Sequence, residues 1–273
     1  MKITLIISVY NRSDFLDIVL SSVFRQSCKN FDVIIAEDGN CKAIKEVVES
    51  YRSRQSISIT HLTQEDKGFR KCRILNRAVE SAIGKFLAFI DGDCPVHRHF
   101  ISEYAKRCKD NVCLFGRRVM VGKLFTDKLL NRELTMEHVN MASIVCSDSK
   151  RKENSIYLPF RISFRKHGIV GSNFCVSKKN MLDINGFDED FETACIGEDT
   201  DVERRLRLIG VDFLSTKFNT IQYHLHHKMI DRETSYNKSY LVYAEKLRRN
   251  SSWCDNGLIK KNALCEKRKL INQ

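Results

Sequence analysis

The sequence contains no long apolar run, and no segment approaches the roughly 18 consecutive apolar residues that a membrane-spanning helix needs. The first residues, MKITLIISVYNRSD, include a short apolar run without the small-residue cleavage site of a secretory signal. Internal repeats and low-complexity segments are also missing. With 42% hydrophobic residues among 273, we expect a globular protein with a conventional core, located in the cytoplasm.

Cys-x-x-Cys pairs are also missing, although the chain contains eleven cysteines. An odd number of cysteines in a chain of this length does not suit a disulfide framework, because such frameworks belong mainly to much smaller secreted domains. We therefore expect reduced thiols, most of them buried as small apolar side chains.

Acidic residues are in deficit, with 34 Asp/Glu against 46 Lys/Arg and a formal net charge of +12. This excess favours an acidic partner, which can be a nucleic acid, an anionic membrane or a phosphorylated substrate. Residues 228–273 carry eleven Lys/Arg against five Asp/Glu, and the segment SYLVYAEKLRRNSSW mixes aromatic, apolar and basic residues as an interfacial helix does. This end of the chain is either a solubilising tail or a helix that lies on an anionic membrane surface.

The first hundred residues alternate between strand-like and helix-like patterns. Strands are predicted at 3–10, 31–40, 56–62 and 85–93, and helices at 15–26, 41–53 and 72–83. Alternation of this kind with short links predicts a mostly parallel α/β sheet with right-handed crossovers and helices on its faces. Ligands of such sheets bind beyond the carboxyl ends of the strands.

The pattern is looser after residue 100. A helix is predicted at 101–110 and a strand at 111–120, followed by helices and mobile loops from about 123 to 166. The stretch GEDTDVERRLRLIG predicts a helix whose first turn is acidic and whose later turns are basic, as the helix dipole favours. We expect one domain over residues 1–228, with functional halves at 1–100 and 101–228, and a basic helical extension over 229–273.

Three of the predicted strands end in polar residues that should meet at one edge of the sheet. These ends are Tyr10-Asn11-Arg12, Glu37-Asp38-Gly39 and Asp91-Gly92-Asp93. Two carboxylates flanking a glycine suit Mg²⁺ or Mn²⁺, which complete their coordination with water and substrate phosphates. An Asp-Gly turn that only closes a strand has the same sequence, so this pattern needs partners elsewhere.

Candidate partners occur at three other places in the chain. Lys67, Arg70 and Lys71 lie near a predicted helix start, where cations either face a diphosphate or are simply solvated. The pair Glu198-Asp199 is either ordinary helix capping or a general base for a hydroxyl nucleophile. In YHLHHK, His224 and His227 are either core histidines or metal ligands.

Six ordered motifs over residues 3–228 resemble the family 2 glycosyltransferases of the GT-A fold. The second half resembles the galactosyltransferase-type C-terminal region that also occurs in chondroitin-polymerase-like bacterial enzymes. The motifs are SVYNR, EDGN, KGFRKCRILNRAV, FIDGDC, GSNFCVSKKNMLDINGFDEDF and GEDTDVERRL. The resemblance implies a Rossmann-like, mostly parallel sheet flanked by helices, with further helices at the C-terminus.

The resemblance also implies roles for particular residues. The nucleotide-sugar half would bind a UDP-sugar and the following half the acceptor. Asp93 and Asp91 would form the metal-binding DxD motif with His224 and His227, and Asp199 would be the catalytic base beside Glu198. The residues that would bind the nucleotide-sugar donor are Tyr10, Asn11, Arg12, Glu37, Asp38, Lys67, Arg70, Asn76, Asp91 and Gly92.

Two positions depart from the family pattern. Ser8 replaces the proline before the first turn, and Ala194-Cys195-Ile196-Gly197 replaces the aromatic residue that usually packs on the acceptor sugar. The first change should loosen the turn without removing nucleotide contacts. The second leaves the acceptor undefined.

These observations predict inverting transfer of a hexose or N-acetylhexosamine from a UDP-sugar to a glycan or lipid-linked glycan. The reaction would use Mn²⁺ or Mg²⁺ and serve bacterial surface polysaccharide (lipopolysaccharide or capsule) synthesis, with the enzyme peripheral on the inner face of the cell membrane. A sugar-nucleotide nucleotidyltransferase is the alternative, but the turn SVYNRSDF lacks the glycines of its usual loop. A nucleic-acid partner is not expected, because the aromatic-basic interleaving of RNA-binding modules is missing.

Overall fold

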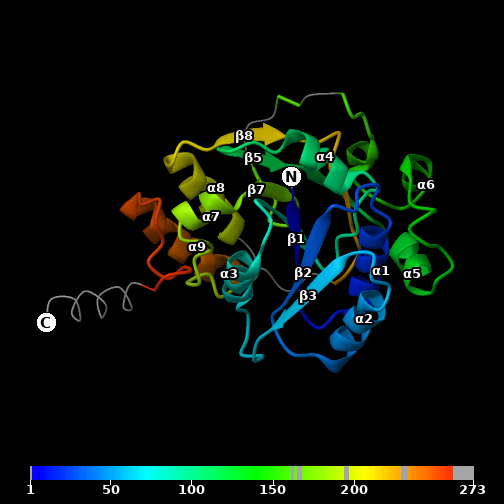
Figure 1. Ribbon diagram of the computed structural model, residues 1–273, viewed down its shortest axis with the longest axis horizontal. Coiled ribbons are helices and arrows are strands. Elements are labelled where there is room, and N and C mark those ends of the chain that lie inside the picture. The colour runs from blue at the N-terminus through cyan, green and yellow to red at the C-terminus, as the bar shows by residue number, and fades with distance from the viewer. Residues whose placement is uncertain (1, 161–162, 165–167, 194–196, 229–232, 261–273) are drawn as a thin grey trace, which may run out of the picture.

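A mixed seven-stranded sheet forms the centre of the protein (Figure 1). The computed structural model describes residues 2–160, 163–164, 168–193, 197–228 and 233–260. The strand order is β3-β2-β1-β4-β7-β5-β8, and β7 alone runs antiparallel to its two neighbours. The strands of this sheet are β1 (Ile3–Val9), β2 (Phe31–Glu37), β3 (Ser58–Thr63), β4 (Phe86–Asp91), β5 (Val112–Phe115), β7 (Phe174–Ser177) and β8 (Asp212–Ser215). The predicted mostly parallel sheet is therefore confirmed.

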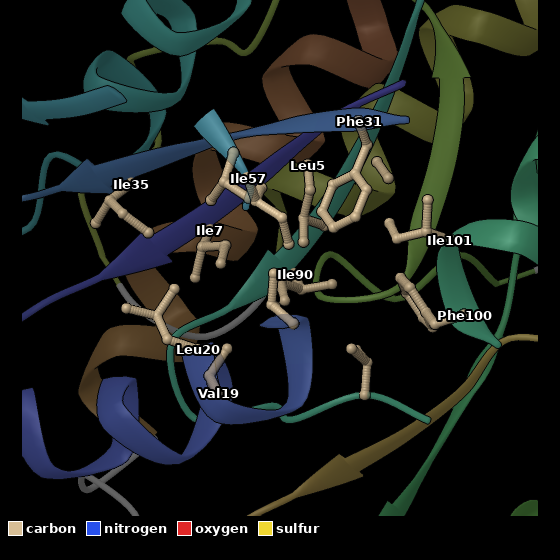
Figure 2. Close-up of a cluster of buried hydrophobic side chains, with 14 of the residues drawn as sticks. Leu5, Ile7, Val19, Leu20, Phe31, Ile35, Ile57, Ile90, Phe100 and Ile101 are labelled. Atoms are coloured by element: carbon tan, nitrogen blue, oxygen red, sulfur yellow. The ribbon is translucent and has the colours of Figure 1, made fainter. Parts of the chain in front are cut away.

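Helices cover both faces of the sheet, because its central strands are buried on both sides. One face carries α1 (Ser13–Phe24), α2 (Lys42–Arg52) and α4 (Phe100–Arg107). The other carries α3 (Lys71–Ser81), α7 (Lys178–Asp183) and α8 (Glu198–Leu208). Figure 2 shows the first face, where Leu5 and Ile7 of β1 point into one cluster with Leu20 of α1, while Ile6 points into the opposite cluster.

The predicted strand over 111–120 is wrong as a single element, because the chain breaks at Gly116. Residues before the break form β5 in the main sheet, and those after it form β6 (Arg117–Met120), which pairs in parallel with β9 (Ile221–His224). A Cβ atom on Gly116 would lie 2.4 Å from the side-chain nitrogen of Asn173. Only glycine therefore lets the backbone pass so close to Asn173.

Asn173 is fully buried and joins the two sheets. Its amide nitrogen donates to the carbonyl oxygens of Arg117 and Thr220, both at 3.0 Å. Its amide oxygen accepts a hydrogen bond of 2.7 Å from the Tyr104 hydroxyl on α4. A fully satisfied buried amide of this kind fixes the position of β6 and β9 relative to the main sheet.

Residues 123–160 contain short helices, in agreement with the helices predicted there. These are α5 (Lys123–Leu130), α6 (Met141–Val145) and the 3₁₀ helix η1 (Lys152–Ser155). Phe125 and Leu129 of α5 pack with Phe15 of α1 and with Ile221 and Tyr223 of β9 in a third hydrophobic cluster. This cluster holds the two-stranded sheet against the first half of the chain.

The basic segment near the C-terminus forms helix α9 (Glu233–Arg249), as predicted. Val242 and Tyr243 pack against the cluster that also contains α3, α7 and α8, and Ser239 and Lys246 are buried. In Figure 1, α9 lies beside α7 and α8, away from α1 and α2. Among the described residues, no helix combines the length and apolarity required to cross a membrane.

Candidate active site

A cleft of about 600 Å³ lies at the carboxyl ends of β1, β2 and β4, where the polar strand ends were predicted to meet. Its walls also include residues far along the chain, before α8 and after β9. The side chains and backbone that line it belong to Ser8, Tyr10, Arg12, Phe15, Asp38, Phe69, Lys71, Asp91, Gly92, Asp93, Glu192, Thr193, His227 and Lys228. The predicted convergence of strand ends is therefore present.

The Asp91-Gly92-Asp93 turn packs directly on the end of β1. The Gly92 amide donates to the Ser8 carbonyl at 2.7 Å, and a Cβ atom on Gly92 would lie 2.9 Å from the Cβ of Val9. No larger residue fits without moving β1. This tight turn sends the two aspartate side chains to different partners.

Asp91 is held by groups of the protein. Its Oδ1 accepts hydrogen bonds from the Ser8 hydroxyl at 2.6 Å and from Lys71 Nζ at 2.8 Å. Lys71 Nζ also lies 3.6 Å from a carboxylate oxygen of Glu198 at the start of α8. Asp91 stands outside the cluster of possible metal ligands described below, and its predicted role as a direct ligand stays a prediction.

The ammonium group of Lys71 lies between two carboxylates. Burial alone would lower the pKa of its ammonium group, but the carboxylates of Asp91 and Glu198 raise that pKa above its ordinary value. Burial raises the pKa of Glu198, and the charge of Lys71 opposes that rise. Lys71 thus connects the cleft to the start of α8.

The two histidines lie beside Asp93 because the segment after β4 pairs with β9. The amides of Tyr223 and Leu225 donate to the carbonyls of Pro95 and Asp93 at 2.9 Å, and the His97 amide donates to the Ile221 carbonyl at 3.0 Å. This antiparallel pairing sets the residues around β9 directly beside Asp93. Residues more than a hundred positions apart in sequence therefore form one site.

Asp93, His224 and His227 form a cluster whose ligand atoms all lie within 4.8 Å of one another. Asp93 Oδ2 lies 3.1 Å from His227 Nε2 and 3.5 Å from His224 Nε2. Burial alone would raise the pKa of Asp93, but the hydrogen bond with His227 and the charge of His224 lower it well below its usual range. The same hydrogen bond raises the pKa of His227, whereas burial lowers the pKa of His224.

The chemistry of this cluster fits a divalent transition metal. His227 Nδ1 contacts the Lys228 carbonyl at 3.1 Å, an interaction that leaves the Nε2 lone pair of a neutral ring directed at the cluster. The buried Nδ1 of His224 has no hydrogen-bond partner among the described residues. One carboxylate and two imidazoles suit Mn²⁺ better than Mg²⁺, which prefers an all-oxygen shell.

The acids at the end of β2 have separate roles. Asp38 lines the cleft and accepts hydrogen bonds from the Gln64 side chain at 2.6 Å and from the Arg70 amide at 2.7 Å. Glu37 is fully buried, with His61 Nε2 2.7 Å from one oxygen and the Cys41 amide on the other at 2.5 Å. The Glu37 carboxylate thus holds the Cys41 backbone and the His61 side chain, and its predicted contact with a ligand stays a prediction.

Asn76 is also placed in the interior. Its amide nitrogen donates to the Phe187 carbonyl at 2.9 Å and to Glu189 at 3.0 Å, while its oxygen accepts from the Phe187 amide at 2.8 Å. Asn76 is 3% exposed, so this side chain joins α3 to the loop after α7 and has no surface left for a donor. Its predicted contact with the nucleotide stays a prediction.

The remaining predicted donor-binding residues lie at the rim. Tyr10 is half exposed and donates to Asp66 at 3.2 Å, and Arg12 lies over the Phe15 ring at 3.4 Å. Asn11, whose φ of 48° is left-handed, borders a neighbouring cavity of about 650 Å³. Lys67 points to solvent beside Glu65, 2.8 Å away, and does not line either cavity.

Arg70 contributes its backbone to the site through the Asp38 hydrogen bond. Its guanidinium donates to the Glu65 carbonyl, and its buried Nε has no partner among the described residues. The sequence did not single out Gln64, Phe15, Glu192 or Thr193, which share no charge pattern. The structure finds them because they line these two cavities.

The pair Glu198-Asp199 begins α8, with Gly197 before it. Gly197 has a φ of 133°, and a Cβ atom there would lie 2.3 Å from the Phe191 ring. Asp199 accepts hydrogen bonds from the Gly171 amide at 3.0 Å and the Thr200 amide at 2.7 Å, which fix its carboxylate. The unusual residues 194–196, where the family carries an aromatic, lie outside the described residues.

Two family models match most of the sequence. The model described as glycosyl transferase family 2 matches residues 4–172, and the model described as N-terminal domain of galactosyltransferase matches residues 154–228. The chain belongs to glycosyl transferase family 2. This membership supports glycosyl transfer over the nucleotidyltransferase alternative.

Individual relatives and structures give the same result. The chain is 26% identical over 242 residues to a chondroitin synthase of Escherichia coli, covering 81% of this chain and 34% of that protein. It is similar in structure to a mannosyltransferase of Pyrobaculum calidifontis in complex with GDP-Man and Mn²⁺, with TM-score 0.63, 13% identity and coverage of 90% and 64%. It is also similar in structure to S. aureus TarS 1-349 in complex with UDP-GlcNAc. The TM-score is 0.56 and the identity 17%, with coverage of 90% of this chain and 67% of that chain.

These similarities establish the fold. The predicted GT-A fold is confirmed, together with membership of glycosyl transferase family 2. The chain spans about a third of the length of the E. coli relative, so that protein's complete activity is not transferred to it.

The metal cluster gives a direct prediction. Asp93→Asn and His227→Ala should each weaken Mn²⁺ binding by about tenfold or more, because even outer-shell partners of metal sites cost about 10- to 100-fold when removed. Isothermal titration with MnCl₂ measures this. His226→Ala is the matched control, because His226 is exposed and lies outside the cluster. Equal Mn²⁺ affinity in Asp93→Asn and the unmodified protein would refute the assignment.

Proposed function

We propose that the protein transfers a hexose or N-acetylhexosamine from a UDP-sugar to a glycan hydroxyl with inversion at the anomeric carbon. The carrying observation is that Asp93, His227 and Lys71 line one cleft at the carboxyl ends of the parallel strands, with His224 beside Asp93 and His227 in one cluster of possible metal ligands. One solved structure of similar fold is a complex with UDP-GlcNAc, and another is a complex with GDP-Man and Mn²⁺. These complexes support a nucleotide-sugar donor. The chondroitin synthase relative supports a glycan acceptor.

In this proposal Asp199 is the base. Its carboxylate takes the proton of the acceptor hydroxyl while that oxygen bonds to the anomeric carbon, and the bond from this carbon to the diphosphate oxygen breaks. UDP leaves with the electron pair of the broken bond. The backbone amides of Gly171 and Thr200 hold the Asp199 carboxylate in place during the proton transfer.

Glu198 and Lys71 act beside the base. Glu198 would orient the acceptor, and its separation of 3.6 Å from Lys71 keeps its charge balanced. Asp93, His224 and His227 would hold the cation, and a cation bound there supplies positive charge to the departing diphosphate. Asp38, which is fixed by Gln64 and Arg70, would accept hydrogen bonds from the nucleoside.

A donor panel tests the proposed function. Purified protein should hydrolyse at least one UDP-sugar slowly to UDP with Mn²⁺, and far less after EDTA treatment, because the cation balances the leaving diphosphate. A coupled UDP assay measures this, with GDP-mannose as the control donor. Turnover of the GDP-sugar alone would overturn the choice of nucleotide, and equal rates with EDTA would overturn the metal requirement.

The base assignment gives a second prediction. Asp199→Asn should reduce transfer by about 10²- to 10⁴-fold, the range that general base catalysis contributes, while UDP affinity stays unchanged. Transfer to an added glycan and UDP binding by calorimetry measure the two quantities. Asp110→Asn is the control, since that carboxylate pairs with Lys85 on the surface. Retained transfer by Asp199→Asn would exclude it as the base.

We also propose that the protein associates with anionic membranes on which a lipid-linked acceptor is carried, as expected in bacterial surface polysaccharide synthesis. The outward side of α9 carries Tyr240 and Leu241, 54% and 70% exposed, with Arg248 also exposed. The Tyr236 and Tyr240 rings stack with their planes 6° apart. Aromatic and basic groups on one helix surface favour an anionic interface.

Vesicle flotation tests this association. Full-length protein should float with vesicles that contain anionic lipid and not with neutral ones, and a Tyr240→Ser, Leu241→Ser, Arg248→Glu variant should lose this binding. Leu124→Ser is the control, because Leu124 is an apolar residue that is 67% exposed and lies on α5, not on α9. Flotation of the triple variant at the level of the unmodified protein would show that α9 does not bind the membrane.

A further inference from the structure

Helix α9 inserts a charged side chain against the loop that precedes α8. The side chain of Lys246 is 9% exposed, and its Nζ lies 2.7 Å from the fully buried carboxylate of Asp188. The same ammonium group donates to Asp190, which also accepts from Asn256 at 2.8 Å. One lysine therefore pairs with two carboxylates on a loop that precedes α8.

This loop forms part of the wall of the cleft. Glu192 and Thr193 line the cleft, and the Thr193 hydroxyl shares a hydrogen bond with Ser239 of α9. Phe191 is buried and its ring lies against Gly197, the residue before Glu198 and Asp199. The position of residues 188–193 thus bears on both the wall and the start of α8.

A buried lysine is an unusual choice for packing alone. Moving an ammonium group out of water costs several kcal/mol, and an apolar residue of similar volume often serves as well or better in a core. Without the Lys246 ammonium group, the carboxylates of Asp188 and Asp190 would repel each other, because no cation would then lie between two like charges. The ion triad therefore determines one loop conformation.

We propose that Lys246 is a positioning residue of the glycosyltransferase, which holds residues 188–193 so that the cleft wall and the start of α8 are aligned for transfer. This inference rests on the proposed function for the role of Asp199, but it makes an independent statement about the loop. It also assigns α9 to the catalytic unit, although the sequence suggested an extension that begins at residue 229.

Hydrogen exchange and steady-state kinetics on full-length variants test this role. Lys246→Met should expose the amides of residues 188–193 to faster exchange and lower kcat on the order of 10- to 100-fold, since small misplacements near a reacting centre have such effects. The KM for the donor and the affinity for UDP should change little. Lys246→Arg should restore much of the kcat, because it keeps the positive charge.

Two further variants complete the experiment. Arg249→Met is the matched control on the same helix, because the ion pairs of Arg249 with Glu245 and Asp255 lie at the surface. Asp190→Asn, at a carboxylate 42% exposed, is the milder change if Lys246→Met does not fold, and should shift exchange and kcat in the same direction.

The outcomes separate the two proposals. Unchanged exchange at 188–193 and unchanged kcat in Lys246→Met, or in Asp190→Asn where the first variant is unfolded, would overturn the positioning role. Equal losses of UDP affinity and kcat without rescue by Lys246→Arg would reduce Lys246 to a general structural role, and so overturn it as well. Absence of transfer by the unmodified protein would overturn the proposed function, while the exchange result still decides the loop.

Discussion

The candidate metal site depends on the pairing between β9 and the residues that follow β4. Hydrogen bonds from Tyr223 and Leu225 to the carbonyls of Pro95 and Asp93 bring the end of β9 beside the aspartate turn. Without this pairing, Asp93 would be an isolated carboxylate on a loop. The pairing is maintained from behind by Asn173, which bonds to backbone on both sides of the junction between the sheets.

The same turn separates the two aspartates by function. Gly92 packs so closely against Val9 that the backbone conformation of the turn is fixed. The side chains of Asp91 and Asp93 therefore point to different partners. Asp91 is matched by a lysine of the protein and by the Ser8 hydroxyl, whereas Asp93 faces two imidazoles. The serine in place of the family proline therefore contributes a hydrogen bond that proline has no side-chain group to make.

Much of this arrangement could be predicted from sequence because it follows from local patterns. Alternating strands and helices predict where strand ends meet, and the Asp-Gly-Asp turn with the His224/His227 spacing identifies candidate ligands. Contacts between distant residues have no such pattern. Nothing local shows that Gly116 must pass Asn173, or that the amide of Asn76 is already used by Phe187 and Glu189. Family motifs likewise do not distinguish a residue that touches substrate from one, such as Glu37, that supports the residue beside it.

The charge balance of the cleft supports the proposed use of a divalent cation. Lys71 already faces Asp91 and Glu198, so its single charge is shared before any donor binds. A diphosphate adds further negative charge next to Asp38, Asp91 and Asp93, and charges this close in a partly buried site repel strongly. The Nε2 atom of His227 donates a proton to a hydrogen bond with the Asp93 carboxylate. A divalent cation can take the place of this proton between the two side chains and brings a greater positive charge. In the proposed reaction, a divalent cation held by Asp93, His224 and His227 would offset the charge of the donor diphosphate.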